Sequence, residues 1–337
     1  IDIFLVKYKI FYMVIIVIIM ILVLIGCNEK DTNVLQQFQL TSCDLLIIDS
    51  FNNVSTQISD LDPTLYSTHD DDGIRELGNL IIDSRLEGDT AKYKLFFSEY
   101  IGEYEQNNVF IRYIYSSDNI IWKEKIGNII NRPLEDPYVV LYDNIYYLFA
   151  EDKLEVPFRN IRRYHSVDCD VWVDDGIVLD VNEGNYYENR DVSSPVVFIK
   201  DSLWLMYYEG RGDDWSGSIN LATSSDGLNW IKEHKYNPLY KPGQIETEWD
   251  FGSSVPDDIF FINDEYYLIY HALGQQNKWY IGILTSNDLY NWFKIHTNPF
   301  ISLMELMVST RPTGYFLYYI MENNYIKVIE IEEIYCE

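Results

Sequence analysis

The sequence predicts an all-β fold, a five-bladed β-propeller whose blades have four strands each and whose last blade is closed by an N-terminal strand. Three observations predict it. A seven-residue motif recurs at intervals of 50, 58 and 62 residues, a β-rich hairpin precedes each copy, and helical periodicity is nowhere sustained after residue 40. Repeats of this length are typical of propeller blades.

The repeated motif is Ser-x-Asp-x-x-x-Trp. Its Asp favours a turn, because the side chain accepts a hydrogen bond from its own backbone two residues further on. The Trp then begins an outer strand and should pack between blades. We interpret the motif as structural and give it no catalytic part. Its copies run from Ser116 to Trp122, Ser166 to Trp172, Ser224 to Trp230 and Ser286 to Trp292.

The hairpins mark equivalent positions in successive blades. Their strands lie at 80–83 with 93–98, 138–142 with 145–150, 196–199 with 203–208, 259–262 with 266–271, and 315–321 with 325–331. Aligning the turns places Asp136, Ser194 and Asp257 at one position. A second position holds Glu99, Glu151, Glu209 and Ala272. The last hairpin lacks the motif, so we expect the segment 45–48 to complete the fifth blade.

The first 26 residues have the layout of a signal peptide. Lys7 and Lys9 precede an uncharged apolar run over 10–25, and Gly26-Cys27 follows it. This junction resembles the lipobox of bacterial lipoproteins, which implies lipidation of Cys27 and a location in the cell envelope outside the cytoplasm. An uncleaved transmembrane anchor is the alternative. We therefore expect a signal peptide at 1–26, a tether at 27–40 and a propeller domain at 41–337.

Composition restricts the partners. The net charge of −28 disfavours nucleic acid and anionic lipid surfaces, so we expect no nucleic-acid partner and a monomer. The aromatic content of 16% suits sugar stacking, but Tyr and Trp also suit strands. An oxidising location permits a disulfide, and the meeting of the chain ends in a closed ring suggests Cys43 with Cys336, which leaves Cys169 free.

The blade openings carry a family resemblance over residues 70 to 330. Glu135-Asp136-Pro137-Tyr138 followed by Tyr146-Tyr147-Leu148-Phe149 resembles a blade opening of the five-bladed glycosidases, the arabinanase, xylosidase, invertase and levansucrase group of glycoside hydrolase families 43 and 32. Ser193-Ser194-Pro195-Val196 and the stretch from Leu221 to Trp230 resemble later blades of the same group. The resemblance implies a fold more strongly than an activity.

The resemblance implies three acids that converge on the ring axis. Asp136 matches the second acid, which holds the sugar and tunes the proton donor. The aligned position for the first acid is Gly78, so we favour Asp72 as the base, with Asp71 and Glu76 as close alternatives. Breaking a glycosidic bond needs one protonated carboxyl group and one carboxylate.

The third acid, the proton donor, lacks a match because its expected position falls near Ser193. We select Glu209, whose neighbours Met206, Tyr207 and Tyr208 should raise its pKa. Alternatively, Glu99, Glu151 and Glu209 are merely repeated solvated strand ends. The candidate substrate contacts are Asp71, Glu76, Glu188, Asp191, Asp257 and Arg190.

We expect no cofactor. A structural calcium ion in the central channel, held with the help of His271, is an alternative. Two functions follow from these residues. The first is a membrane-anchored extracytoplasmic glycoside hydrolase with Asp72 as base, Asp136 as orienting residue and Glu209 as acid. The second is a glycan-binding propeller lipoprotein without catalysis. A glycoside phosphorylase is a third, which the small number of Lys and Arg, 25 against 53 acids, favours less.

Overall fold

Antiparallel β-strands make up nearly all of the regular structure. A computed structural model describes residues 63–69, 71–86, 91–154, 158–243, 248–262, 264–274, 278–295, 306–311, 314–321 and 324–331. These residues belong to one compact unit, Ser50–Glu333, and their only helix is the 3-10 turn η1 (Ser84–Leu86). Within them, no helix is long and apolar enough to cross a membrane.

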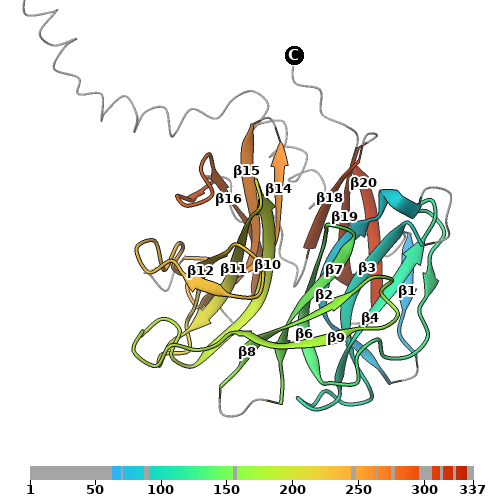
Figure 1. The fold of residues 1–337 in the computed structure, drawn as a ribbon, viewed down its shortest axis with the longest axis horizontal. Helices are drawn as coiled ribbons and strands as arrows, with labels where there is room; N and C mark the ends of the chain where they lie inside the picture. Colours follow the sequence, from blue (N-terminus) through green and yellow to red (C-terminus); the bar gives the residue numbers. More distant parts are fainter. Residues whose placement is uncertain are drawn as a thin grey trace, which may run out of the picture. The chain divides into compact units, whose positions relative to one another are not determined.

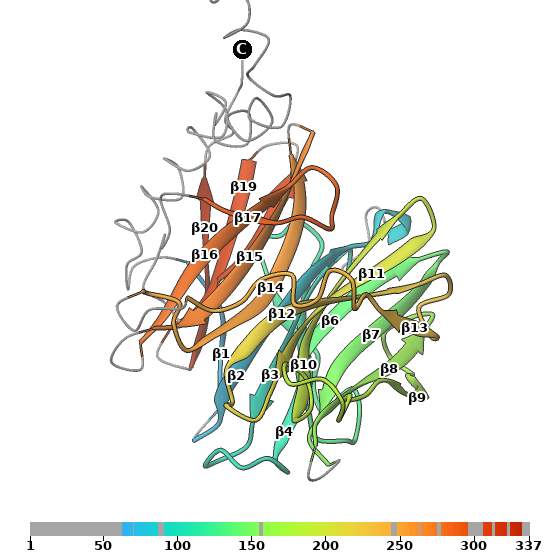
Figure 2. The same ribbon diagram turned by 90° about the vertical axis from the view of Figure 1, so that its left-hand side faces the viewer.

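The strands pair into five groups of four, which we call blades one to five (Figures 1 and 2). Blade one holds β2 (Gly73–Ile82), β3 (Tyr93–Tyr100), β4 (Val109–Ser116) and β5 (Lys123–Glu124). Blade two holds β6 (Leu134–Tyr142), β7 (Ile145–Asp152), β8 (Asn160–Ser166) and β9 (Val173–Leu179). Blade three holds β10 (Asp191–Lys200), β11 (Leu203–Arg211), β12 (Gly217–Ser224) and β13 (Trp230–Lys232).

Blade four holds β14 (Ser253–Ile262), β15 (Glu265–Leu273), β16 (Trp279–Ser286) and β17 (Phe293–Lys294). A single pair of strand residues, Gly217 with Ser253, joins the sheets of blades three and four into one eight-stranded sheet. Blade five holds β18 (Leu306–Arg311), β19 (Gly314–Met321), β20 (Tyr325–Ile331) and, as its outer strand, β1 (Thr64–Ser67). The first strands of successive blades, β2, β6, β10, β14 and β18, contact one another in turn, and β18 also contacts β2.

The outer strand of blade five comes from the N-terminal side of the described residues. The segment Thr64–Ser67 pairs antiparallel with β20, and the predicted segment 45–48 lies outside the described residues. Tyr66 joins this strand to blade one, because its ring packs 4.9 Å from that of Phe97 and its hydroxyl donates to Glu99 at 2.6 Å. Cys43 and Cys336 also lie outside the described residues, while Cys169 is a buried free thiol whose pKa burial raises to about 12.

The Ser and Asp of the Ser-x-Asp-x-x-x-Trp motif form the same hydrogen-bonded turn in all four copies, and the Trp Nε1 adds a hydrogen bond in the last three. In blade three, Asp226 Oδ1 accepts the backbone N–H groups of Leu228 and Asn229, and Trp230 Nε1 donates to the carbonyl of Gly227. The residue after the Asp has a positive φ in each copy, between 63° and 71°. The motif is therefore structural, as predicted.

The motif tryptophans join neighbouring blades. Trp172 packs against Phe96, Trp230 against Phe149, and Trp292 against Tyr207, at centroid distances of 6.5, 5.8 and 5.5 Å. In each pair, the partner ring belongs to the blade that precedes the blade of the Trp. The apolar core accordingly lies between blades, in clusters that combine residues of blades one and two and of blades two to four.

A side-chain amide fastens blade one to blade two. Asn79 donates to the carbonyl of Val139 and accepts its N–H, both at 2.7 Å. Next to it, a Cβ atom on Gly78 would lie 2.5 Å from the carbonyl oxygen of Pro137, so the two inner strands approach too closely for any side chain there. Strands β2 and β6 therefore have a fixed relative register.

Candidate active site

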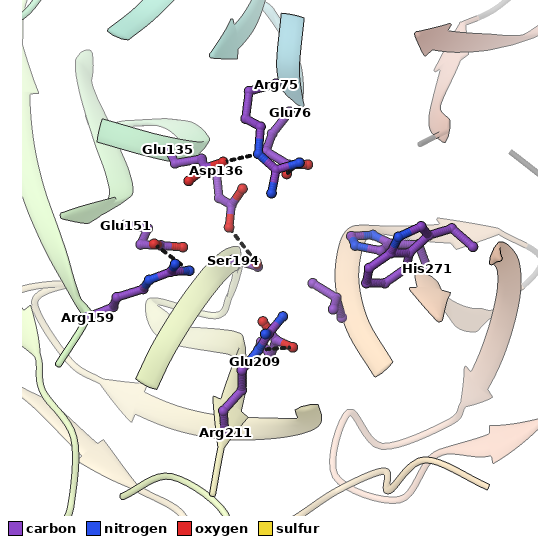
Figure 3. Close-up of a pocket in the computed structure, with 12 residues that line it drawn as sticks. Arg75, Glu76, Glu135, Asp136, Glu151, Arg159, Ser194, Glu209, Arg211 and His271 are labelled. Atoms are coloured by element: carbon purple, nitrogen blue, oxygen red, sulfur yellow. Dashed lines mark hydrogen bonds and ion pairs between the residues drawn. The ribbon is translucent and has the colours of Figure 1, made fainter. Parts of the chain in front are cut away.

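A polar pocket of about 150 Å³ opens where the inner strands begin and the second strands end (Figure 3). Blades one to four all contribute to it. Its lining residues are Arg75, Glu76, Glu135, Asp136, Glu151, Arg159, Ser194, Glu209, Arg211, Val255, His271 and Trp279. Of the acids that the sequence analysis selected, Glu76 and Glu209 lie in the pocket with Asp136.

β-bulges turn the key side chains of blades two and three toward the pocket. The register of β6 shifts between Glu135 and Tyr138, and that of β10 between Ser193 and Val196. Asp136 and Ser194 sit in these bulges with φ of 51° and 47°. A bulge leaves its extra residue unpaired and redirects its side chain. Ser194 Oγ donates to Asp136 Oδ2 at 2.6 Å. The two positions that the sequence aligns as equivalent therefore touch each other at the pocket.

Blade one presents Glu76 to the pocket. Strand β2 contains two register shifts, Ile74 to Glu76 and Leu77 to Leu80, where β6, β10 and β14 have one each. Counted from the paired strand, Ile74 opposes Glu99 just as Glu135 opposes Glu151. Arg75, which the first shift leaves unpaired, therefore corresponds to Asp136, and Glu76 follows it. Counting back from the turn reaches the second shift first and ends within it, at Gly78.

The favoured base, Asp72, does not line the pocket. Its Oδ1 accepts the backbone N–H of Gly102 at 2.9 Å, which ties the start of blade one to the loop after β3. Asp71 is exposed in the adjoining turn and is also outside the pocket lining. The structure thus brings Glu76, rather than Asp71 or Asp72, together with Asp136.

The acids at the ends of the second strands are buried and paired with cations. Glu99, Glu151 and Glu209 are only 1–2% exposed, so they are not solvated strand ends. Glu99 pairs with Arg112 at 2.8 Å and Glu151 with Lys153 at 2.9 Å.

Glu209 departs from its expected protonation. Burial raises its pKa, but Arg211 at 2.9 Å and the hydroxyls of Ser253 and Ser193 outweigh burial, and the pKa of Glu209 is lowered overall. The expectation of a raised pKa was wrong, because these polar partners, and not the apolar neighbours in sequence, surround the carboxylate. An ionised Glu209 is a poor proton donor at neutral pH.

Four other predicted contact residues lie outside the main pocket. Glu188 is buried beside Tyr208 Oη at 2.7 Å and Lys232 Nζ at 2.8 Å. Asp191 accepts the N–H of Arg159 at 3.2 Å, and Arg190 forms a surface pair with Asp213. Asp257 lines a smaller adjoining cavity and bonds His271 Nδ1 at 2.6 Å.

The pKa values of Glu76 and Asp136 are raised, whereas that of Glu209 is lowered. Burial, with opposition from Arg75 and support from Glu135, raises the pKa of Glu76 to about 7. Burial and the charges of Glu76, Glu151 and Glu135 raise the pKa of Asp136 well above its usual range. One oxygen each of Glu76, Glu135 and Asp136 lie within 4.8 Å of one another. Because the charge of Glu76 helps to raise the pKa of Asp136, these two carboxyl groups titrate together.

The same three carboxyl groups do not suit a calcium ion. Calcium takes six to eight oxygen ligands. Here Arg75 already contacts both Glu76 and Glu135, and Lys153 contacts Glu135, so cationic side chains hold the carboxylates. His271 Nδ1 bonds Asp257, which is not one of these three carboxyl groups.

Known structures share this architecture. A glycosyl hydrolase from Bacteroides ovatus superposes with a TM-score of 0.62 at 12% identity, over 82% of this chain and 94% of that chain. A thermostable family-43 glycoside hydrolase gives 0.57 at 14% identity, over 79% and 92%. The chain has the fold of the five-bladed propeller glycoside hydrolases.

A third propeller comes from work on the family-130 mannoside phosphorylases, a family that contains glycoside hydrolases targeting β-1,2 mannosidic linkages in Candida mannan. It superposes at 0.58 and 14% identity, over 78% of this chain and 84% of that chain. No protein-family model and no curated protein matches the sequence. At these identities the likeness shows the propeller fold and leaves the activity to the residues of the pocket.

Replacing Glu76 by Gln should alter how the stability of this propeller depends on pH. Because the folded-state pKa is raised to about 7, the folded protein loses stability as the pH rises from about 4.5 to 7 and Glu76 ionises. Glu76→Gln removes that loss. We expect the variant to exceed the parent by on the order of 2–3 kcal/mol at pH 8, with the difference shrinking toward pH 4.5.

Urea unfolding of parent and variant between pH 4.5 and 8 measures the difference. The exposed Glu103 supplies the control, since Glu103→Gln should leave the pH dependence as it is. A Glu76→Gln difference that stays constant with pH would contradict the assignment of a buried, proton-binding carboxyl group.

Proposed function

We propose that this chain is a glycoside hydrolase whose reacting carboxyl groups are Glu76 and Asp136. The observation that carries the proposal is the contrast within one pocket. Glu135, Glu151 and Glu209 are held by cations, whereas burial outweighs the contact of Arg75 with Glu76 and favours the protonated form of Glu76 and of Asp136. A pair that shares a proton provides an acid and a carboxylate together, which is what glycosidic cleavage needs.

In the proposed reaction, the protonated member of the pair donates its proton to the glycosidic oxygen as the bond to the sugar carbon breaks. The ionised member attacks the sugar carbon as positive charge develops on the ring, which gives a glycosyl-enzyme intermediate. Water, deprotonated by the first group, then releases the sugar and restores both carboxyl groups. Ser194 holds Asp136 by its hydrogen bond, and Arg75 holds Glu76 at 3.1 Å. A separation within 4.8 Å is shorter than the roughly 6.5–9.5 Å of inverting enzymes. We therefore expect retention of anomeric configuration.

A glycan-binding protein without catalysis is the second candidate. It is favoured by blade three, where Ser193 and Ser194 occupy the bulge that could have offered a third acid, and by the ionised state of Glu209. A screen of 4-nitrophenyl glycosides and of neutral and acidic polysaccharides separates the two candidates. Cleavage supports the hydrolase, and binding without product supports the second candidate.

We also propose that β1 closes the propeller ring by completing blade five. The pairing of β1 with β20 and the contact of β18 with β2 support this closure.

We further propose that the propeller is exported and held at the membrane by a lipid on Cys27, which lies outside the described residues. The support is the Lys7, Lys9, apolar run and Gly26-Cys27 order of the sequence. In cells fed an alkyne analogue of palmitate, we expect the parent and a Cys169→Ser control to carry the label and Cys27→Ser to lose it. Equal labelling of Cys27→Ser and the parent would show that Cys27 carries no lipid anchor.

A further inference from the structure

Three arginines from three blades reach the same pocket. Arg75 comes from β2, Arg159 from the segment before β8, and Arg211 from the end of β11. Their side chains are 37%, 31% and 28% exposed, so each is partly desolvated but still reachable from the pocket. No sequence pattern groups these three arginines, because they lie far apart in the chain.

Buried carboxylates hold each arginine by part of its guanidinium. Arg75 uses Nε for Glu135, and Arg159 uses Nη1 for Glu151 at 3.1 Å. Arg211 uses Nε for Glu209 at 2.9 Å, and within the described residues its two terminal amines make no hydrogen bond. A guanidinium anchored in this way presents a fixed edge of donors that matches the two oxygens of a carboxylate.

The charges of the anchoring groups balance one another. Four carboxylates, Glu135, Glu151, Glu209 and Asp191, face four cations: Arg75, Lys153, Arg159 and Arg211. Arg75 also contacts Glu76 at 3.1 Å. The terminal amines of Arg211 are therefore the donors of this group that stay open to an anion of the ligand.

The opposite wall has another character. Figure 3 shows His271 across the pocket from Arg159, and the ring of Trp279 lies 4.9 Å from that of His271. An aromatic surface facing a row of arginines suits a ligand with one apolar ring face and one anionic substituent.

We propose that the pocket binds an acidic sugar, a uronic-acid residue, whose carboxylate takes the terminal amines of Arg211 with Arg159 beside it. This inference rests on the proposed function, since it names the substrate class of that site. The chemistry recognised is an oxyanion, which a free phosphate ion could also provide. In that case the phosphate would replace water as the attacking group.

Calorimetric titration of the full chain with monosaccharides tests the inference without requiring cleavage. The probes are glucuronate, its neutral methyl ester, glucose and inorganic phosphate. We expect glucuronate to bind about 10- to 100-fold more tightly than glucose or the ester, the range for a hydrogen-bonded charged group. Arg211→Lys keeps the charge but loses the two-pronged geometry, and should remove most of that preference. The surface Arg190 is the matched control, since Arg190→Gln should bind like the parent.

Each outcome has one meaning. Equal binding of glucose and glucuronate, or an unchanged preference in a folded Arg211→Lys variant, overturns the inference. Phosphate that binds in place of glucuronate, with the same dependence on Arg211, overturns the acidic sugar and identifies phosphate as the anion. If the protein prefers glucuronate but cleaves no acidic glycan, the inference of an acidic sugar stands and the proposal of a hydrolase is wrong.

Discussion

Glu76→Gln and Asp136→Asn should each lower kcat/KM on a cleaved glycan by about 10²- to 10⁴-fold, the usual contribution of a general acid or base. Both changes are nearly isosteric. Each removes either the proton that must be donated or the charge that faces the positive transition state. The screen described above supplies the substrate, and NMR of the first product anomer reports retention in the same assay.

Asp72→Asn is the matched control for this prediction. An Asn at that position can still accept the N–H of Gly102, so the loop stays in place, and Asp72 does not line the pocket. We expect the activity of Asp72→Asn to stay within a few-fold of the parent. A large loss in Asp72→Asn together with an active Glu76→Gln would return the role of base to Asp72.

Trp292→Ala should cost about 3–5 kcal/mol of unfolding free energy, the usual range for a buried Trp. Trp292 is 7% exposed, and its ring meets that of Tyr207 edge-on at 5.5 Å, so its loss opens a cavity between blades three and four. The 58% exposed Trp215 provides the comparison. Trp215→Ala should change stability by less than about 0.5 kcal/mol. Equal losses in urea unfolding would mean that the motif tryptophans do not join the blades.

The repeat could be predicted from the sequence because its structure is local. Ser224, Asp226 and Trp230 make their hydrogen bonds within seven residues, so the motif marks a turn wherever it occurs. Asp136 was found for a similar reason, since Asp-Pro before an alternating segment marks the start of an inner strand.

The rest of the site depends on contacts between blades. Glu76 reaches the pocket because two bulges shift the register of β2. One of these bulges contains Gly78, which lies close to Pro137 of blade two. The pKa of Glu209 depends in part on Ser253, which arrives from blade four. An alternating apolar pattern likewise could not choose between 45–48 and Thr64–Ser67 as the outer strand of blade five, since Tyr66 meets its partners only in the folded ring.

The amide of Asn79 has a consequence for ligand binding. Its two hydrogen bonds to Val139 lie only a few residues from Glu76 on one strand and from Asp136 on the other. The two carboxyl groups are thereby preorganised, although they come from separate blades. The entropy of bringing them together is lost during folding, not when a sugar arrives. A ligand should therefore meet a nearly rigid site, and the backbone of the free and bound protein should differ little around the axis.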